Sequence, residues 1–269
     1  MKILKISHTV DNPSRYSYKA NYDVWDRVEG DHIFFSHIRP DFDFNKYDVL
    51  FLPPIVRLKL FPEILKRIKD SKAKKVLFDN DSCYHRFSEE AYQGMDYIFY
   101  RDSDKKGGTP ECPSMWLPWW VDTDYYLPSY GGSGVSFNCT VSKHYPLRVQ
   151  IHRSVLRSTQ HTWDKYVKSL QDSAGSIHTD SPTVRQVRAK ALEIASCGTQ
   201  IISNRTSRMD YFFPDELMTY FDSVDELKEI VRNFEPNIEV QKELRRIVET
   251  KHSSDIRAKE VIEKVKSIL

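Results

Sequence analysis

The stretch ALEIASCGTQIIS, residues 191–203, combines a helical pattern, a glycine and a short apolar run. Apolar residues recur at helical spacing upstream of the glycine and predict a helix over residues 183–196. Gly198 is expected to end this helix, because glycine tolerates the left-handed backbone that commonly follows a helix. The run that comes next, residues 199–203, predicts a buried strand. A helix that leads into a buried strand is the repeating unit of a parallel α/β sheet.

The first half of the chain shows the same alternation of strands and helices. Short apolar runs predict strands at residues 1–7, 46–54, 74–81 and 96–102, and residues 58–68 carry apolar side chains at helical spacing. Together these elements predict a parallel sheet whose strands are joined by crossover helices.

A Gly-Gly-Ser-Gly stretch at residues 131–134 predicts a flexible linker between two domains, residues 1–130 and 135–269. The second domain continues the α/β pattern, and Asp222 is expected to cap a helix over residues 222–234. The other elements predicted there are strands at 135–140 and 176–180 and helices at 145–158, 236–250 and 254–268.

The composition indicates a globular protein and excludes several classes. The chain has 269 residues, of which 40% are hydrophobic and 29% charged, and its net charge of +2 does not by itself call for nucleic acid or an anionic membrane. No apolar run approaches the roughly 18 residues of a membrane span. The first residues read as a strand rather than a signal peptide. The absence of a G-x-G-x-x-G fingerprint after that strand argues against a dinucleotide-dependent oxidoreductase.

The cysteines bear on the location of the protein. Cys83, Cys112, Cys139 and Cys197 form no C-x-x-C pair, so neither a zinc site nor a redox motif is indicated. Unpaired cysteines favour a reducing compartment, and we expect the protein in the cytoplasm.

The decisive stretch and the segment RMDYFFPDELMTYFDSVDELKEIV (208–231) together resemble the donor-binding signature of GT-B glycosyltransferases of group 1. The CgeB-type, or spore-maturation-like, family has the most similar pattern. As in that family, Lys190 stands three places before Glu193, and Gly198 and a buried strand follow.

The resemblance implies an α/β fold of two Rossmann-like domains facing a cleft, with extra terminal helices in the C-terminal domain. Residues 1–130 would form the acceptor-side domain and residues 135–269 the nucleotide-sugar donor-binding domain. The implied activity is a metal-independent hexosyl transfer from a nucleotide sugar, with a UDP-sugar as the expected co-substrate and no cofactor. Two features depart from the pattern: Cys139 stands where the family has a glycine near the diphosphate, and the stretch 150–180 is short.

The candidate donor site lies in the second domain. The Glu193 carboxylate can accept hydrogen bonds from both ribose hydroxyls, and such charge-assisted bonds are strong. Lys143 and Arg148 follow the first strand of this domain and can stabilise the charge of the leaving diphosphate. Ordinary roles stay open, including solvated lysines at Lys143 and Lys190 and a helix cap at Ser181. The expected donor-binding residues are Glu193, Lys190, Arg185, Lys143, Arg148, Ser181, Gly198 and Thr199.

The candidate general bases lie in the first domain. Asp79 and Asp81 come at the carboxyl end of a predicted strand, where ligands bind in open α/β sheets. His8 ends the first predicted strand and is the second candidate.

Two alternatives stay open. A protein of the same fold could bind a nucleotide sugar without turnover. Cys139 favours this reading, and so does Arg185, which stands eight places before Glu193 where many relatives of the resembled family have an acid. A DNA-modifying glycosyltransferase acting on hydroxylated bases is the other, because residues 143–168 and 66–75 are rich in Lys and Arg. The acceptor is left open between a glycan, a protein and modified DNA, and so is the oligomeric state.

Overall fold

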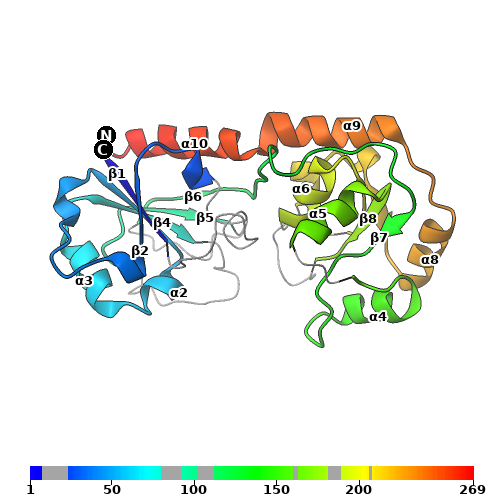
Figure 1. The fold of residues 1–269 in the computed structure, drawn as a ribbon, viewed down its shortest axis with the longest axis horizontal. Coiled ribbons are helices and arrows are strands. Elements are labelled where there is room, and N and C mark those ends of the chain that lie inside the picture. Colours follow the sequence, from blue (N-terminus) through cyan, green and yellow to red (C-terminus); the bar gives the residue numbers. More distant parts are fainter. Residues whose placement is uncertain (8–23, 80–91, 102–111, 160–162, 181–188, 206–207) are drawn as a thin grey trace. The chain divides into compact units, whose positions relative to one another are not determined.

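The computed structural model shows two compact α/β units (Figure 1). Unit 1 comprises Met1–Pro118 and Arg257–Leu269, and unit 2 comprises Trp119–Ile256. The chain therefore passes from unit 1 into unit 2 and back again. The residues that the structure describes are 1–7, 24–79, 92–101, 112–159, 163–180, 189–205 and 208–269.

Unit 1 is built on a parallel sheet whose described strands are, in spatial order, β2 (Asp31–Phe34), β1 (Ile3–Ser7), β3 (Val49–Leu52), β4 (Lys74–Asp79), β5 (Tyr97–Tyr100) and β6 (Ser114–Trp116). β1, β3 and β5 are buried along their whole length, as strands covered on both faces of a parallel sheet must be. The predicted strands at 1–7, 46–54, 74–81 and 96–102 are confirmed. The sequence pattern does not predict β2, which is only half buried, or β6, which is very short.

Short helices follow β3 in unit 1. They are α2 (Ile55–Leu58) and α3 (Pro62–Asp70), and the 3-10 turns Phe35–His37 and Phe44–Lys46 lie earlier in the unit. Ile68 of α3 packs in one core with Leu50 of β3 and Leu77 of β4. The helical pattern predicted over residues 58–68 is thereby confirmed from residue 62 onward, whereas residues 59–61 lie between α2 and α3 and Leu60 is exposed.

The last helix, α10 (Ser254–Lys266), belongs largely to unit 1. Val261 and Val265 lie one helical turn apart and are fully buried, and Lys264 Nζ lies 5.1 Å from the centre of the Tyr97 ring in β5. This division differs from the expected one, in which the second domain extends over this helix. An amphipathic helix can pack its apolar side against the core of either unit, and α10 packs in unit 1.

The Gly-Gly-Ser-Gly stretch lies inside unit 2 and does not connect the units. The Gly134 carbonyl accepts hydrogen bonds from the backbone N–H groups of Ala174 and Gly175, at 3.0 and 3.1 Å. These bonds hold the stretch against its own unit. The boundary falls instead between Pro118 and Trp119, before the aromatic segment that sequence reasoning assigned to the first domain.

Unit 2 is built on a second parallel sheet, whose described strands are, in spatial order, β10 (Thr219–Phe221), β9 (Gln200–Asn204), β8 (Gly175–His178) and β7 (Val135–Ser136). Its helices are α4 (Pro146–Ser154), α5 (Trp163–Gln171), α6 (Ala189–Ser196), α7 (Met209–Phe212), α8 (Val224–Arg232) and α9 (Ile238–Ile247), with a 3-10 turn at Asp215–Leu217 and a π-helical turn at Val248–His252. Successive residues of β9 point to opposite faces of the sheet. Ile201 packs with α5, α6 and α9, and Ile202 packs with α4 and α8.

Three local predictions in unit 2 need correction. The strand expected over 135–140 is limited to β7, and the short stretch 150–180 contains a complete helix, α5, that the sequence analysis does not predict. The N-cap of α8 is Ser223 rather than Asp222, because the Ser223 hydroxyl accepts the hydrogen bond from Glu226 N at 3.1 Å. The predicted helices over 145–158, 183–196, 222–234, 236–250 and 254–268 are confirmed by α4, α6, α8, α9 and α10 over their described parts.

Candidate functional site

Polar residues gather where the strands of unit 2 end. Asn138 and Cys139 follow β7, Thr179 and Asp180 follow β8, and Asn204 ends β9. Because the strands are parallel, their carboxyl ends meet at one edge of the sheet, where open α/β folds bind ligands. We call this set of residues, with the side chains that reach them, the carboxyl-edge cluster.

The middle of the carboxyl-edge cluster is a hydrogen-bonded connection between β8 and β9. The backbone N–H of Asp180 donates to Asn204 Oδ1 at 3.1 Å, and Asn204 Nδ2 donates to the Asp180 carbonyl at 3.2 Å. His178 Nδ1 lies 3.1 Å from the Ser203 hydroxyl, and His178 Nε2 lies 3.4 Å from Asp180 Oδ2. The side chains of His178 and Asp180 are each 1% exposed, so the two strand ends form a rigid floor.

The pKa of the buried His178 ring is affected by the positive charges near it. Burial, together with the nearby charges of Lys190 and Arg148, lowers the pKa of His178 to about 3. The ring is therefore neutral at physiological pH. The same two cations make this edge of the sheet attractive to an anion.

Arg148 reaches the cluster from α4. Its Nε donates to Thr179 Oγ1 and its Nη2 donates to the Thr179 carbonyl, both at 2.8 Å. The guanidinium carbon also lies 4.3 Å from the centre of the Tyr145 ring. These contacts fix a permanently charged group beside the carboxyl end of β8.

Lys190 reaches the cluster from α6. Its ammonium group donates to the Asn138 carbonyl oxygen, and it lies 3.8 Å from Cys139 Sγ and 5.0 Å from the centre of the Tyr166 ring. Cys139 is buried beneath it. Cys139, which departs from the family pattern, therefore contacts Lys190, which matches that pattern.

The Glu193 carboxylate is buried and already hydrogen-bonded. Glu193 is 2% exposed, and the Tyr166 hydroxyl donates to its Oε2 at 2.6 Å. Burial raises the pKa of Glu193, while the hydrogen bond from Tyr166, the charge of Lys190 and a hydrogen bond from Tyr126 lower it. A ribose diol at this carboxylate has to share it with two tyrosine hydroxyls.

Gly198 and Thr199 do not join the carboxyl-edge cluster, because they precede β9 and so lie at its opposite end. Gly198 has φ of +73° and ends α6, with its N–H donating to the Ala195 carbonyl at 3.1 Å. The Thr199 hydroxyl is buried and donates to the Leu170 carbonyl at 2.7 Å. Both residues connect α6 and α5 to the sheet.

The other expected donor residues have separate outcomes. Lys143 is exposed in the loop between β7 and α4, close in sequence to the cluster. Arg185 and Ser181 lie outside the described residues, so their roles stay predictions.

The candidate bases belong to unit 1. Asp79 ends β4, as predicted, but it is buried, and the Tyr92 hydroxyl donates to its Oδ2 at 2.8 Å. Burial and the Asp79 charge raise the pKa of Tyr92. Asp81 and His8 lie outside the described residues.

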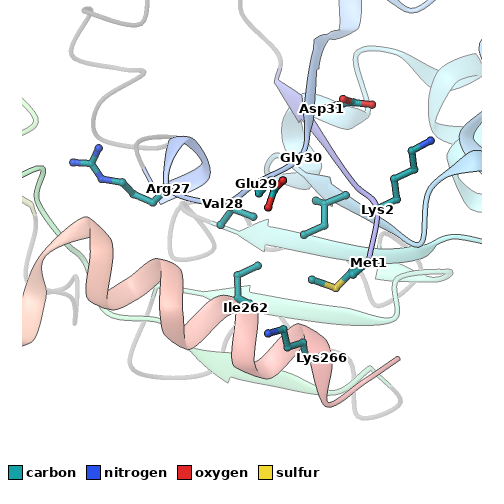
Figure 2. Close-up of a pocket in the computed structure, with 10 residues that line it drawn as sticks. Met1, Lys2, Arg27, Val28, Glu29, Gly30, Asp31, Ile262 and Lys266 are labelled. Carbon is teal, nitrogen blue, oxygen red and sulfur yellow. The ribbon is translucent and has the colours of Figure 1, made fainter.

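Unit 1 also has a pocket of about 400 Å³ between the start of β1 and α10 (Figure 2). Lys2, Glu29, Gly30 and Lys266 are among its lining residues. It opens at the amino ends of β1 and β2, the edge opposite Asp79, and no candidate site residue lines it.

Sequence reasoning misses several members of the carboxyl-edge cluster. His178 and Asp180 fall within the predicted strand 176–180, and Asn204 directly follows the strand at 199–203. The rule that ligands bind at carboxyl ends of parallel strands could have selected all three. Tyr166 carries no such signal, because its contact with Glu193 depends on how α5 packs on α6.

Two α/β units, each built on a parallel sheet, are the architecture of the GT-B class of glycosyltransferases. A family model described as glycosyl transferase-like matches residues 124–263. The chain belongs to this family and is a glycosyltransferase. A comparison with curated proteins finds no match.

Solved structures of the same fold cover almost the whole chain. Anabaena HepE in complex with UDP-glucose has a TM-score of 0.68 at 12% identity, covering 99% of this chain and 100% of that one. Sucrose-phosphate synthase from Thermosynechococcus elongatus has 0.68 at 8%, covering 99% and 98%. The DNA-modifying enzyme beta-glucosyltransferase has 0.67 at 11%, covering 100% and 99%. At these identities the likeness establishes the fold.

No helix among the described residues has both the length and the apolar character needed to cross a membrane. Within the same residues, no three His, Cys, Asp or Glu side chains gather as a metal site would require. Metal independence stays a prediction.

Proposed function

We propose that unit 2 binds a UDP-sugar and that the enzyme transfers the sugar to an acceptor hydroxyl without a metal ion. The observation that carries the proposal is that Arg148 and Lys190 stand together at the carboxyl edge of the sheet, close enough to depress the pKa of His178. The fold is shared with HepE, whose structure contains UDP-glucose. We also assign the chain to the CgeB-type branch, on the spacing of Lys190, Glu193 and Gly198.

The two cations suit a diphosphate leaving group. Lys190 donates to a neutral backbone carbonyl of Asn138, and a phosphate oxygen would be a stronger, charge-assisted acceptor. Arg148 has two of its nitrogens on Thr179, and a guanidinium carries further N–H donors. Stabilising the developing charge with protein cations is the task that a divalent metal performs in other enzymes.

Glu193 is the proposed ribose ligand. When ionised, a carboxylate accepts several hydrogen bonds, so a ribose diol can join or replace the Tyr166 hydroxyl. Positively charged Lys190 nearby favours the ionised form. Asp79 is the proposed base in unit 1, and the Tyr92 hydroxyl that donates to its Oδ2 stabilises the carboxylate and so lowers its basicity.

The cellular location that we propose is the cytoplasm. Among the described cysteines, Cys112, Cys139 and Cys197 are all free thiols and all buried. This is typical of proteins that remain in a reducing compartment.

The test is a calorimetric and thermal-shift titration with UDP, GDP, TDP and CMP, followed by hydrolysis of the matching sugar nucleotides with and without EDTA. A nucleotide at 100 times its Kd should stabilise the fold by about 2.7 kcal/mol. We expect a response to UDP that Lys190→Ala loses and that Lys242→Ala keeps, because Lys242 is exposed on α9 and paired with Glu239. Stabilisation by none of the nucleotides would refute the donor site, and loss of hydrolysis in EDTA would refute metal independence.

A further inference from the structure

The segment 141–159, which contains α4, carries four Lys and Arg residues and no acid. Lys143, Arg153 and Arg157 are exposed, and none of their charged groups makes an ion pair or hydrogen bond with the described residues. We call these three residues the basic face. The histidines at 144 and 152 lie in the same segment and add charge only when protonated.

Two other helices of unit 2, α8 and α9, neutralise their cations locally. The basic residues of α8 and α9 stand three or four places from an acid on the same helix or the turn that follows it. The pairs are Lys228 with Asp225, Arg232 with Glu229, Lys242 with Glu239, Arg245 with Glu249 and Arg246 with Glu243. The basic face lacks this neutralisation, so it presents uncompensated positive charge to solvent.

Packing does not explain the basic face. α4 attaches to unit 2 through Ile151, which is fully buried, and through Leu147 and Val155, in the core shared with α8. Figure 1 shows α4 beside α8 on the outside of the sheet of unit 2. Arg153 lies on the exposed side of α4, Lys143 and Arg157 lie in the segments before and after the helix, and none of the three contributes to that core.

The basic face begins beside the carboxyl-edge cluster. Arg148 lies on α4 between Lys143 and Arg153, and it bonds Thr179 at the end of β8. A long anion that follows the basic face therefore reaches the place where we put the donor. All of these residues belong to unit 2.

The chemistry of the surface selects one kind of partner. No large exposed hydrophobic residue occurs within 141–159, whereas membrane-surface helices and protein interfaces both depend on apolar anchors. Nonspecific binding of nucleic acid is essentially electrostatic and needs none. Two of the three cations are Arg, whose planar fork matches the phosphate group.

We propose that the basic face binds the phosphates of a nucleic acid, and that nucleic acid carries the acceptor hydroxyl. The acceptor part rests on the proposed function, whereas the binding part does not. In the transfer, the hydroxyl oxygen bonds to the anomeric carbon as the bond from that carbon to the diphosphate oxygen breaks. The nucleoside diphosphate leaves with the electron pair, and the hydroxyl proton passes to a base.

The binding test uses the full chain without donor and fluorescently labelled DNA duplexes, single strands and RNA. The variant Arg153→Gln/Arg157→Gln is compared with Lys242→Gln/Arg246→Gln, which removes the same charge from ion-paired positions on α9. We expect log K against log salt to lose about 1.8 of its slope in the first variant, since each phosphate contact contributes roughly 0.9 on duplex DNA. The control pair should bind as the parent does.

Three results would overturn the binding part. They are no binding to any oligonucleotide, equal losses in both double variants, and tighter binding to polyglutamate or to vesicles of anionic lipid than to nucleic acid. Thermal melts of each variant separate lost binding from lost folding.

The acceptor part has its own measurement. Labelled UDP-sugar is incubated with the parent enzyme and with DNA, hydroxymethylated DNA or RNA, and transfer of label to the nucleic acid supports it. Donor hydrolysis that proceeds with no labelled nucleic acid would refute the acceptor while sparing the donor site. If the enzyme neither binds UDP nor hydrolyses the UDP-sugar, the result would refute the proposed function rather than the acceptor.

Discussion

Replacing Tyr166 by Phe tests the buried hydrogen bond between α5 and Glu193. The substitution removes one hydroxyl and no carbon, so it leaves the packing of α5 on α6 intact. The lost bond is the 2.6 Å hydrogen bond to Glu193 Oε2, between two buried side chains. A hydrogen bond to a charged group contributes about 1.5–3 kcal/mol, and the remaining partner stays desolvated. We therefore expect a loss of about 2 kcal/mol in the free energy of unfolding at neutral pH.

The loss should depend on pH with a defined sign. Burial raises the pKa of Glu193, and the Tyr166 hydroxyl opposes that rise, so the substitution raises the pKa further. A native state with a raised carboxyl pKa holds its proton more tightly than the unfolded state does, and it gains relative stability as the pH falls through that pKa. The difference between parent and Tyr166→Phe is thus fully present at high pH and shrinks on acidification.

Urea unfolding followed by tryptophan fluorescence, between about pH 8 and about pH 5, measures both quantities. Tyr130→Phe is the matched control, because Tyr130 is partly exposed and its hydroxyl makes no hydrogen bond with the described residues. An unfolding free energy for Tyr166→Phe within about 0.5 kcal/mol of the control would refute the assigned contact. A loss that grows on acidification would refute the direction of the Glu193 pKa shift.

Further substitutions test other features of unit 2. Gly198→Ala should lower the unfolding free energy by about 1–2 kcal/mol in thermal melts, because φ is +73° and a Cβ would lie 2.9 Å from the Tyr130 ring. Arg245→Met should cost about 3 kcal/mol in urea unfolding, since its guanidinium donates to the buried Ser196 carbonyl at 2.7 Å. The parent should lose stability as the pH falls from about 6.5 towards 3, because His178 has a lowered pKa of about 3 and must stay neutral in the fold. His178→Gln should flatten that slope in acid titrations, and an unchanged slope would contradict the burial of a neutral ring.

Apolar patterns in the sequence predict the central strands of each sheet but not the edge strands β2 and β6 of unit 1. β3 is a continuous apolar run followed by two prolines, and Ile201 and Ile202 give β9 an apolar centre after Gly198, so the sequence itself indicates that these strands are buried. β2 begins with two exposed polar residues at the sheet edge, and β6 has only three residues. Their pairing is decided by neighbouring strands.

The candidate site was predictable in part. Lys190 and Arg148 could be selected because a family pattern and a strand end identify them. The partner of Glu193 could not, because Tyr166 lies 27 residues away on a helix whose position depends on tertiary packing. The apolar spacing of Tyr166, Val167 and Leu170 was nonetheless available as a signal for α5.

The assignment of α10 shows a different limit. The spacing of Val261 and Val265 identifies an amphipathic helix, but periodicity does not say which core receives it. Adjacency along the chain favours unit 2, and the structure buries the helix in unit 1. The same limit applies to the Gly-Gly-Ser-Gly stretch, whose composition suggests flexibility while backbone bonds fix it.

The return of the chain into unit 1 affects how the protein can be made. Residues 257–269 complete the first unit, yet they are synthesised only after all of unit 2. At a translation rate of about 5–20 residues per second, several seconds pass between the synthesis of the strands of unit 1 and that of α10. During this time the apolar surface that α10 covers is exposed. Unit 2 is contiguous and can fold first. An expression fragment that stops at Pro118 would lack the helix for good, so dissecting this enzyme requires a circular permutant that joins α10 to β1.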